Sequence, residues 1–248
     1  MAEIPKIFFA SDFHLGLPAG SQPIEREKKV VKWLNSVAPE AKEIYLLGDV
    51  FDFWWEYKLV VPRGYTRFLG TLAGITDSGI PVHFFTGNHD MWVGDYLVKE
   101  CGVIIHTEPV TKIFDGKKFH LAHGEGLGTN DLSYKILLSI FRNKTLRAMY
   151  SALHPSIGVG IGLRWSLSSR LGKGIKLEFL GEDKEDLIRY AKTILDKDNI
   201  DYFIFGHRHL EMKYNLNNRV EIIFLGDWIM NASYAVWDGI NLDFRPFS

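Results

Sequence analysis

The chain has 248 residues, of which 46% are hydrophobic and 24% are charged, close to the average of globular proteins. This composition excludes disordered, collagenous and low-complexity proteins, and the length predicts a single domain with a large core. The 29 basic and 30 acidic residues give a net charge of −1, which argues against a nucleic-acid binder with a strongly basic face.

The cysteine content and the apolar runs both bear on the compartment. Cys101 has no cysteine partner in the chain, which favours a reducing cytoplasm over an oxidising compartment. The first apolar run, Ile4 to Ala10, lacks the length and the cleavage site of a signal peptide. The longest uncharged apolar stretch, Ser156 to Leu163, contains three glycines and is too short to cross a bilayer. We therefore expect a cytoplasmic protein.

Short apolar runs rich in β-branched and aromatic residues recur along the chain and predict strands. These runs are Lys6–Ala10, Glu43–Leu47, Pro81–Thr86, Lys117–Ala122 and Tyr202–Phe205. Helical patterns at Glu25–Val37 and Tyr65–Thr76 separate the first three, which predicts βαβ units and a largely parallel sheet. Turn signals at Asn217-Asn218 and Asp238-Gly239 predict an antiparallel ending. The result would be an α/β fold with one mixed sheet or two sheets face to face.

The segment 127–180 differs from the rest of the chain. Its apolar pattern predicts one long helix over Leu132–Leu153, ended by His154-Pro155, and a shorter helix over Leu163–Leu171. Eight Lys or Arg and two acids give it a net charge of +6, so the remainder carries −7. We interpret it as a helical insert within a single domain of residues 1–248. Its basic, apolar surface suits an anionic lipid-like partner, although core packing or a solvated helix face explains the same pattern.

Side chains that can bind metal ions follow each of the five predicted strands given above. In open α/β sheets, ligands collect at the carboxyl ends of the strands, so these side chains are expected to converge. They are two carboxylates, one amide and four imidazoles: Asp12, Asp49, Asn88, His14, His123, His207 and His209. Three other histidines, His83, His106 and His120, are expected to be structural.

Seven ligands are more than one tetrahedral zinc ion needs, and they suit two ions that share a bridging carboxylate. Mixed nitrogen and oxygen ligation favours Mn²⁺, with Fe or Zn²⁺ also compatible, over Mg²⁺ or Ca²⁺. Two such ions about 3.5 to 4 Å apart cleave phosphoesters by activating water and neutralising phosphoryl oxygens. The sequence therefore predicts a two-metal hydrolase.

The same segments resemble the metallophosphoesterase signature D-x-H, G-D-x-x-D, G-N-H-D, H-G and G-H-x-H, in this order. The resemblance implies a sandwich of two mixed β-sheets flanked by helices. It assigns Asp12, His14, Asp49 and His209 to one metal, and Asp49, Asn88, His123 and His207 to the other, with Asp49 bridging. His89 would contact the phosphate and protonate the leaving group, with Asp90 available to orient it. Catalytic roles would thus fall to Asp49, Asn88 and His89.

Within this superfamily, the chain is similar to the UDP-2,3-diacylglucosamine pyrophosphohydrolases of lipid A biosynthesis. The similarity lies in Ala10–Leu15, Gly48–Trp54 and Phe244–Phe247. It implies that water attacks the α-phosphorus and releases UMP and 2,3-diacylglucosamine 1-phosphate, that segment 127–180 is a lid, and that the protein contacts the inner membrane peripherally. The substrate-binding residues it implies are Asn88, His89, Asp131, Tyr134, Ser169, Lys173 and His207.

Three departures from that family keep other substrates open. The family has Arg, Asp and Thr where this chain has His89, Glu125 and Arg208. A general metallophosphodiesterase or phosphatase acting on a soluble nucleotide or sugar phosphate would share the same core. A non-catalytic binding scaffold is the third alternative, but such proteins normally lack ligands that are all present here. The sequence gives no indication of the oligomeric state.

Overall fold

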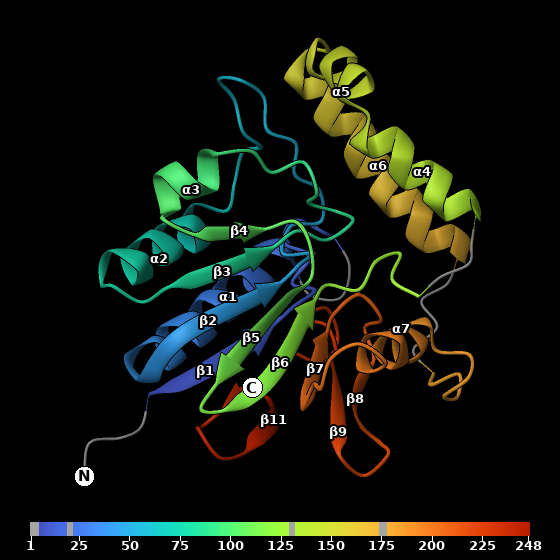
Figure 1. Ribbon diagram of the computed structural model, residues 1–248. Coiled ribbons are helices and arrows are strands. Elements are labelled where there is room, and N and C mark those ends of the chain that lie inside the picture. The colour runs from blue at the N-terminus through green and yellow to red at the C-terminus, as the bar shows by residue number, and fades with distance from the viewer. Residues whose placement is uncertain (1–4, 19–21, 129–131, 174–177) are drawn as a thin grey trace.

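Two β-sheets pack face to face in the computed structural model, which describes residues 5–18, 22–128, 132–173 and 178–248 (Figure 1). In spatial order, the first sheet consists of β11 (Leu242–Pro246), β10 (Ser233–Trp237), β1 (Lys6–Ala10), β2 (Ala41–Leu47), β3 (Val82–Phe85) and β4 (Ile104–His106). The second consists of β5 (Val110–Phe114), β6 (Lys117–Ala122), β7 (Tyr202–Phe205), β9 (Val220–Leu225) and β8 (Glu211–Leu216). Both sheets contain parallel and antiparallel pairs, which confirms the expected fold class.

Helices cover the outer faces of the sandwich. The helices α1 (Pro23–Val37), α2 (Thr66–Asp77) and α3 (Tyr96–Cys101) share one core cluster with the first sheet, and a short 3₁₀ helix, η1 (Ala38–Glu40), leads into β2. The helix α7 (Asp186–Leu195) packs on the second sheet through Leu187, Ile188 and Ala191. The helices expected before β2 and β3 are confirmed, whereas α3 and α7 were not anticipated.

Alternation along the strands divides the core into layers. On β1, Ile7 and Phe9 enter the layer between the sheets, whereas Phe8 and Ala10 face the helices. The ring of Phe9 stacks on Phe119 of the opposite sheet, with 6.1 Å between centroids. Because a register slip of one residue would exchange the two faces, this alternation fixes where each strand ends and therefore where its polar loop begins.

The remaining helices form a separate projection, here called the helical arm (Figure 1). It consists of α4 (Leu132–Arg142), α5 (Lys144–Ser151) and α6 (Pro155–Lys173). The prediction of one helix over Leu132–Leu153 was wrong, because the Asn143 side chain caps α5 by accepting hydrogen bonds from the Thr145 and Leu146 backbone amides. The shorter helix expected from Leu163 in fact begins at Pro155 and includes the three glycines.

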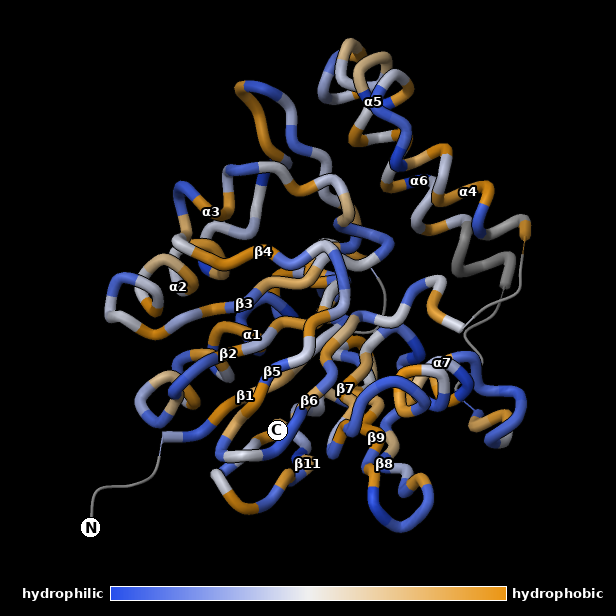
Figure 2. The backbone as a smooth tube through the Cα atoms, viewed as in Figure 1, coloured by the Kyte–Doolittle hydropathy of each residue, from blue (hydrophilic) through white to orange (hydrophobic). Residues whose placement is uncertain are grey.

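Hydrophobic residues recur along the exposed surface of the arm (Figure 2). Leu132, Ile136, Met149 and Ile157 are each more than half exposed. Within the described residues, no helix combines the length and the hydropathy that crossing a membrane requires.

Candidate metal centre

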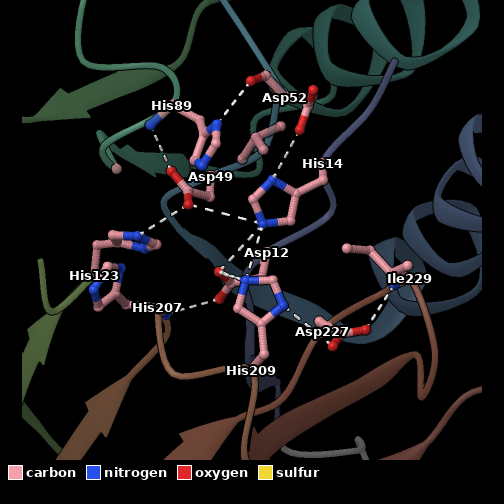
Figure 3. A network of polar contacts seen from close by, with 12 residues as sticks. Asp12, His14, Asp49, Asp52, His89, His123, His207, His209, Asp227 and Ile229 are labelled. Atoms are coloured by element: carbon pink, nitrogen blue, oxygen red, sulfur yellow. Dashed lines mark hydrogen bonds and ion pairs between the residues drawn. The ribbon is translucent and has the colours of Figure 1, made fainter. Parts of the chain in front are cut away.

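The loops that follow β1, β2, β3, β6 and β7 meet at one end of the sandwich, where Figure 3 shows their carboxylates and imidazoles pointing toward one another. Backbone hydrogen bonds join the loops, for example from Asp12 N to Gly48 O (3.0 Å), His14 N to Asp49 O (3.0 Å) and Gly206 N to His123 O (2.9 Å). Side chains that are up to 197 positions apart in sequence are thereby brought into one cluster. This is the convergence that the strand-end pattern predicts.

Asp49 lies at the centre of this cluster. Ligand atoms of Asp12, His14 and His209 lie within 4.8 Å of one another, and so do those of Asp49, His123 and His207. The Asp49 Oδ2 atom is 3.8 Å from His14 Nε2 in the first group and 3.4 Å from His123 Nε2 in the second. A carboxylate between two ligand groups is the arrangement that a bridging ligand requires.

Several buried polar atoms in the cluster lack a hydrogen-bond partner among the described residues. They include Asp12 Oδ1, Asn88 Oδ1 and His123 Nε2. Burying such atoms unpaired costs about 1 to 3 kcal/mol each. All three are acceptors when the imidazole is neutral, so a cation would satisfy them together. The donor set therefore fits divalent metal ions.

Outer contacts orient the imidazoles for metal binding. The Nδ1 atom of His123 lies 2.7 Å from the Leu47 carbonyl oxygen and must donate to it, which leaves the Nε2 lone pair facing Asp49. The Nδ1 atom of His209 lies 3.2 Å from Asp227 Oδ2. Asp227 accepts a hydrogen bond from the backbone amide of Ile229 (Figure 3). A second hydrogen bond, from the backbone amide of Met230, also fixes the position of this carboxylate.

Backbone strain concentrates at the candidate ligands. Five of the seven have positive φ angles: Asp12 (55°), His14 (44°), Asp49 (50°), His207 (65°) and His209 (51°). Non-glycine residues rarely adopt this region, and such strain clusters at functional sites. The glycines in the motifs provide space: a Cβ on Gly87 would overlap the Asp49 carboxylate, and one on Gly206 would lie 2.7 Å from Asp12 Oδ2.

The buried carboxylates of the cluster require positive charge nearby. Burial alone would raise the pKa of Asp49, but the imidazoles of His123, His89 and His14 hold it well below its ordinary value. Burial and the neighbouring His123 lower the pKa of His207 to about 3, so this imidazole is neutral as a metal ligand must be. Burial opposes protonation of His123 as well, yet Asp49 raises the pKa of His123 well above its ordinary value. In the absence of metal, a proton on His123 thus supplies the charge that Asp49 attracts.

His89 and Asp90, which follow Asn88, have different environments. The His89 backbone amide donates to Asp49 Oδ1 at 2.9 Å, and its Nδ1 atom lies 2.9 Å from the Asp52 carbonyl oxygen. The suggestion that Asp90 orients His89 was wrong, because its carboxylate accepts hydrogen bonds from the backbone amides of Gly87, Val50 and Phe51. Asp90 therefore joins the loops after β2 and β3, and burial followed by the nearby Asp49 raises its pKa to about 7.

The two other departures from the resembling family have identifiable surroundings. Arg208 donates to the buried Glu185 carboxylate through Nε (3.0 Å) and Nη2 (2.9 Å). Burial raises the pKa of Glu125 to about 7. Both residues border cavities beside the cluster, Arg208 on the side of the arm and Glu125 on the side of β4 and β5.

The side chains of the substrate-binding residues predicted in segment 127–180 lie outside the described part of the structure. Asp131 lies outside the described residues. Tyr134 belongs to α4, and Ser169 and Lys173 belong to α6, but their side chains lie outside the described part. Sequence reasoning missed Asp227, although Gly226-Asp227 directly follows β9 just as Gly48-Asp49 follows β2. It also missed Ser166 of α6, whose hydroxyl donates to Asp52 Oδ2 at 2.9 Å.

Two adjoining cavities connect the cluster with the arm. The first, about 380 Å³, is bordered by Asn88, His89 and His207 and by Leu138 and Phe141 of the arm. The second, about 520 Å³, is almost wholly apolar. They share a wall formed by Phe53, Trp92, Phe141, Gly162 and Trp165. Of the adjacent Trp54 and Trp55, Trp55 borders the apolar cavity, whereas Trp54 is buried in the core cluster of the first sheet.

A two-sheet sandwich with a cluster of Asp, Asn and His side chains at its strand ends defines a class of metal-dependent hydrolases. The family model for calcineurin-like phosphoesterases matches residues 5–211, so the chain belongs to this family. It is accordingly a metal-dependent hydrolase, and the alternative of a non-catalytic scaffold is set aside.

Relatives with named activities extend over nearly the whole chain. A UDP-2,3-diacylglucosamine hydrolase of Porphyromonas gingivalis is 43% identical over 96% of this chain and 95% of its own length. One from Histophilus somni is 28% identical over 92% of this chain and 94% of its own. Among solved structures, a phosphoesterase from E. coli aligns with 98% of this chain and 100% of its own at 15% identity and a TM-score of 0.47.

Proposed function

We propose that this chain hydrolyses the pyrophosphate bond of UDP-2,3-diacylglucosamine and releases UMP and 2,3-diacylglucosamine 1-phosphate. The 43% identical relative bears the name of this activity. The observation that carries the proposal is the apolar cavity of about 520 Å³ that adjoins the cavity at the metal centre. A soluble nucleotide has no apolar group that would fill such a cavity. Each acyl CH₂ buried in it contributes about 0.8 kcal/mol to the binding free energy.

Two divalent ions are proposed at the cluster, with Mn²⁺ as the physiological metal. Asp12, His14, Asp49 and His209 would hold one ion, and Asp49, Asn88, His123 and His207 would hold the other. When bound, such ions lower the pKa of water and neutralise phosphoryl oxygens. The mixed nitrogen and oxygen donors favour Mn²⁺ over Mg²⁺.

The remaining site residues act on the substrate directly. His89 borders the cavity beside Asn88, where its ring would contact the phosphate and protonate the leaving group. His207 borders the same cavity and would contact the phosphate as well as a metal. Asp131 and Tyr134 are proposed to bind the glucosamine ring, with Ser169 and Lys173 as further contacts from α6.

Segment 127–180, which contains the helical arm, is proposed to be a lid that admits the acyl chains from the cytoplasmic face of a membrane. The exposed Leu132, Ile136, Met149 and Ile157 would enter the interfacial region, and Lys144 and Arg147 would face anionic headgroups. Cosedimentation with vesicles of an anionic phospholipid tests this contact. Replacement of Ile136 and Met149 by Gln should weaken it, and unchanged binding would contradict it.

Product analysis tests the proposed substrate. Purified protein with Mn²⁺ should release UMP from UDP-2,3-diacylglucosamine with a kcat/KM at least about a hundredfold above that for UDP-N-acetylglucosamine, which lacks the acyl chains. Replacement of residues 132–173 by a short linker should remove this preference and lower hydrolysis of bis(p-nitrophenyl) phosphate by no more than about tenfold. Equal losses for both substrates would contradict the role of the lid.

One observation favours a second candidate, a general phosphodiesterase acting on soluble substrates. His89 gives the chain the Asn-His-Asp sequence of the wider superfamily, where the lipid A enzymes have Arg. Faster turnover of a soluble diester than of the diacyl substrate in the same assay would establish this candidate.

A further inference from the structure

One face of α6 approaches the metal-centre loop closely because its residues are small. Gly158, Gly162 and Ser166 are spaced four residues apart and therefore share a face of the helix. A Cβ atom on Gly158 would overlap the Tyr57 hydroxyl, and one on Gly162 would overlap the Phe53 ring. The helix backbone thus packs directly against the Tyr57 and Phe53 side chains, and the next turn brings Ser166 to Asp52 itself.

Ser166 joins the arm to two residues of the site. It is 4% exposed, and its Oγ donates to Asp52 Oδ2 at 2.9 Å and lies 3.2 Å from His89 Nδ1. The same Nδ1 atom lies 2.9 Å from the Asp52 carbonyl oxygen. Because a carbonyl oxygen can only accept, Nδ1 carries a hydrogen, and Ser166 Oγ accepts from it while giving its own hydrogen to the carboxylate.

These contacts select one tautomer of His89. With the hydrogen on Nδ1, the other ring nitrogen faces the cluster, where ligand atoms of His14, Asp49 and His89 lie within 4.8 Å of one another (Figure 3). Asp52 belongs to the body of the protein and holds the ring from one side only. Ser166 supplies the second contact, and it comes from an element that the proposed function assigns to substrate binding.

We propose that Ser166 is a positioning residue, through which docking of the helical arm sets the ring orientation and tautomer of His89. The inference rests on the proposed function only in taking His89 as the residue that contacts the phosphate. Hydrolysis is then fastest when the arm is docked against the metal-centre loops. Binding of acyl chains in the apolar cavity is thereby coupled to the orientation of His89.

Kinetics of Ser166→Ala test this role, with Ser168→Ala as the matched control because Ser168 is exposed on the same helix. Alanine keeps the helix intact. We expect kcat for bis(p-nitrophenyl) phosphate to fall about tenfold with KM unchanged, in the range lost when groups that orient a site are removed. Ser168→Ala should match the wild type. A wild-type kcat in Ser166→Ala, or a change confined to KM for the lipid, would overturn the inference.

Histidine ¹⁵N NMR of the metal-free protein provides a readout independent of turnover. The spectra are recorded at about pH 8.5, two units above the ordinary histidine pKa, with His89 assigned through His89→Asn. We expect the wild-type ring in the Nδ1–H form and a mixture of tautomers in Ser166→Ala. Identical His89 resonances in both proteins would overturn the inference. The proposed substrate and the positioning role can fail separately. If the wild type cleaves the small diester but not UDP-2,3-diacylglucosamine, the proposed substrate is wrong. The positioning role still holds in that case if Ser166→Ala lowers kcat for the diester and changes the His89 tautomer.

Discussion

The metal centre and the helical arm border the same cavity but are held by different interactions. Hydrogen bonds between backbones and from buried carboxylates such as Asp90 and Asp227 fix the strand-end loops. The arm contacts the body through rings, with Trp55 against Tyr150 at 4.2 Å and Trp92 against Phe141 at 5.3 Å between centroids. Directional bonds hold the reacting groups rigidly. The mainly apolar contacts of the arm, apart from the hydrogen bonds of Ser166, allow changes in the arm that affect the lipid substrate more than the chemistry.

The largest effect should come from disturbing the metal centre through its backbone. In Gly87→Ala, the new Cβ overlaps the Asp49 carboxylate, so both ligand groups are displaced. We expect activity toward every substrate to fall more than about a hundredfold, beyond the loss typical of outer contacts to a metal site. Gly74→Ala is the control, because a Cβ there meets nothing within 4 Å. Comparable activity in the two variants would show that the loop tolerates displacement.

A smaller and selective effect should come from the arm. Gly162→Ala overlaps the buried Phe53 ring, whereas a Cβ on Gly160 of the same helix meets nothing within 4 Å. We expect Gly162→Ala to lower kcat/KM for the diacyl substrate about tenfold, with Gly160→Ala unchanged. Hydrolysis of the small diester should fall less than that of the lipid. Equal losses for both substrates would remove the distinction between the two regions.

The smallest effect concerns the stability of the body. His120 of β6 lies between Thr111 Oγ1 (2.9 Å) and the Tyr190 hydroxyl (3.0 Å), and burial lowers its pKa to about 4. The unfolded chain therefore binds a proton more readily, so the contribution of His120 is complete above pH 6.5 and is lost as pH falls from about 6.5 to about 4.

Urea titrations across this range check the direction. The wild type should lose on the order of 2 kcal/mol of unfolding free energy through this group, and His120→Asn should show a correspondingly flatter dependence on pH. His106, whose pKa burial also lowers to about 4, titrates in both proteins and cancels from the difference. Parallel pH profiles for the two proteins would exclude His120 as the source.

The contrast between the regions also decides what could be predicted from the sequence. The ligand positions were predictable because each lies directly after an apolar run, and the sheet topology then brings these run ends together. The contacts of Ser166 and the role of Asp90 were not, because they depend on which loops meet in three dimensions. The predicted start of this helix at Leu163 fell after its first three glycines, yet close packing of Gly158 against Tyr57 and of Gly162 against Phe53 offsets their low helix propensity.

Metal content is the most direct test of the central claim that Asp49 joins two ligand groups into one site. Elemental analysis by mass spectrometry should find two divalent transition-metal ions per active chain. The ratio should fall below one in Asp49→Ala, together with the loss of activity. Active wild-type protein without bound transition metal, or an unchanged ratio in Asp49→Ala, would contradict the account.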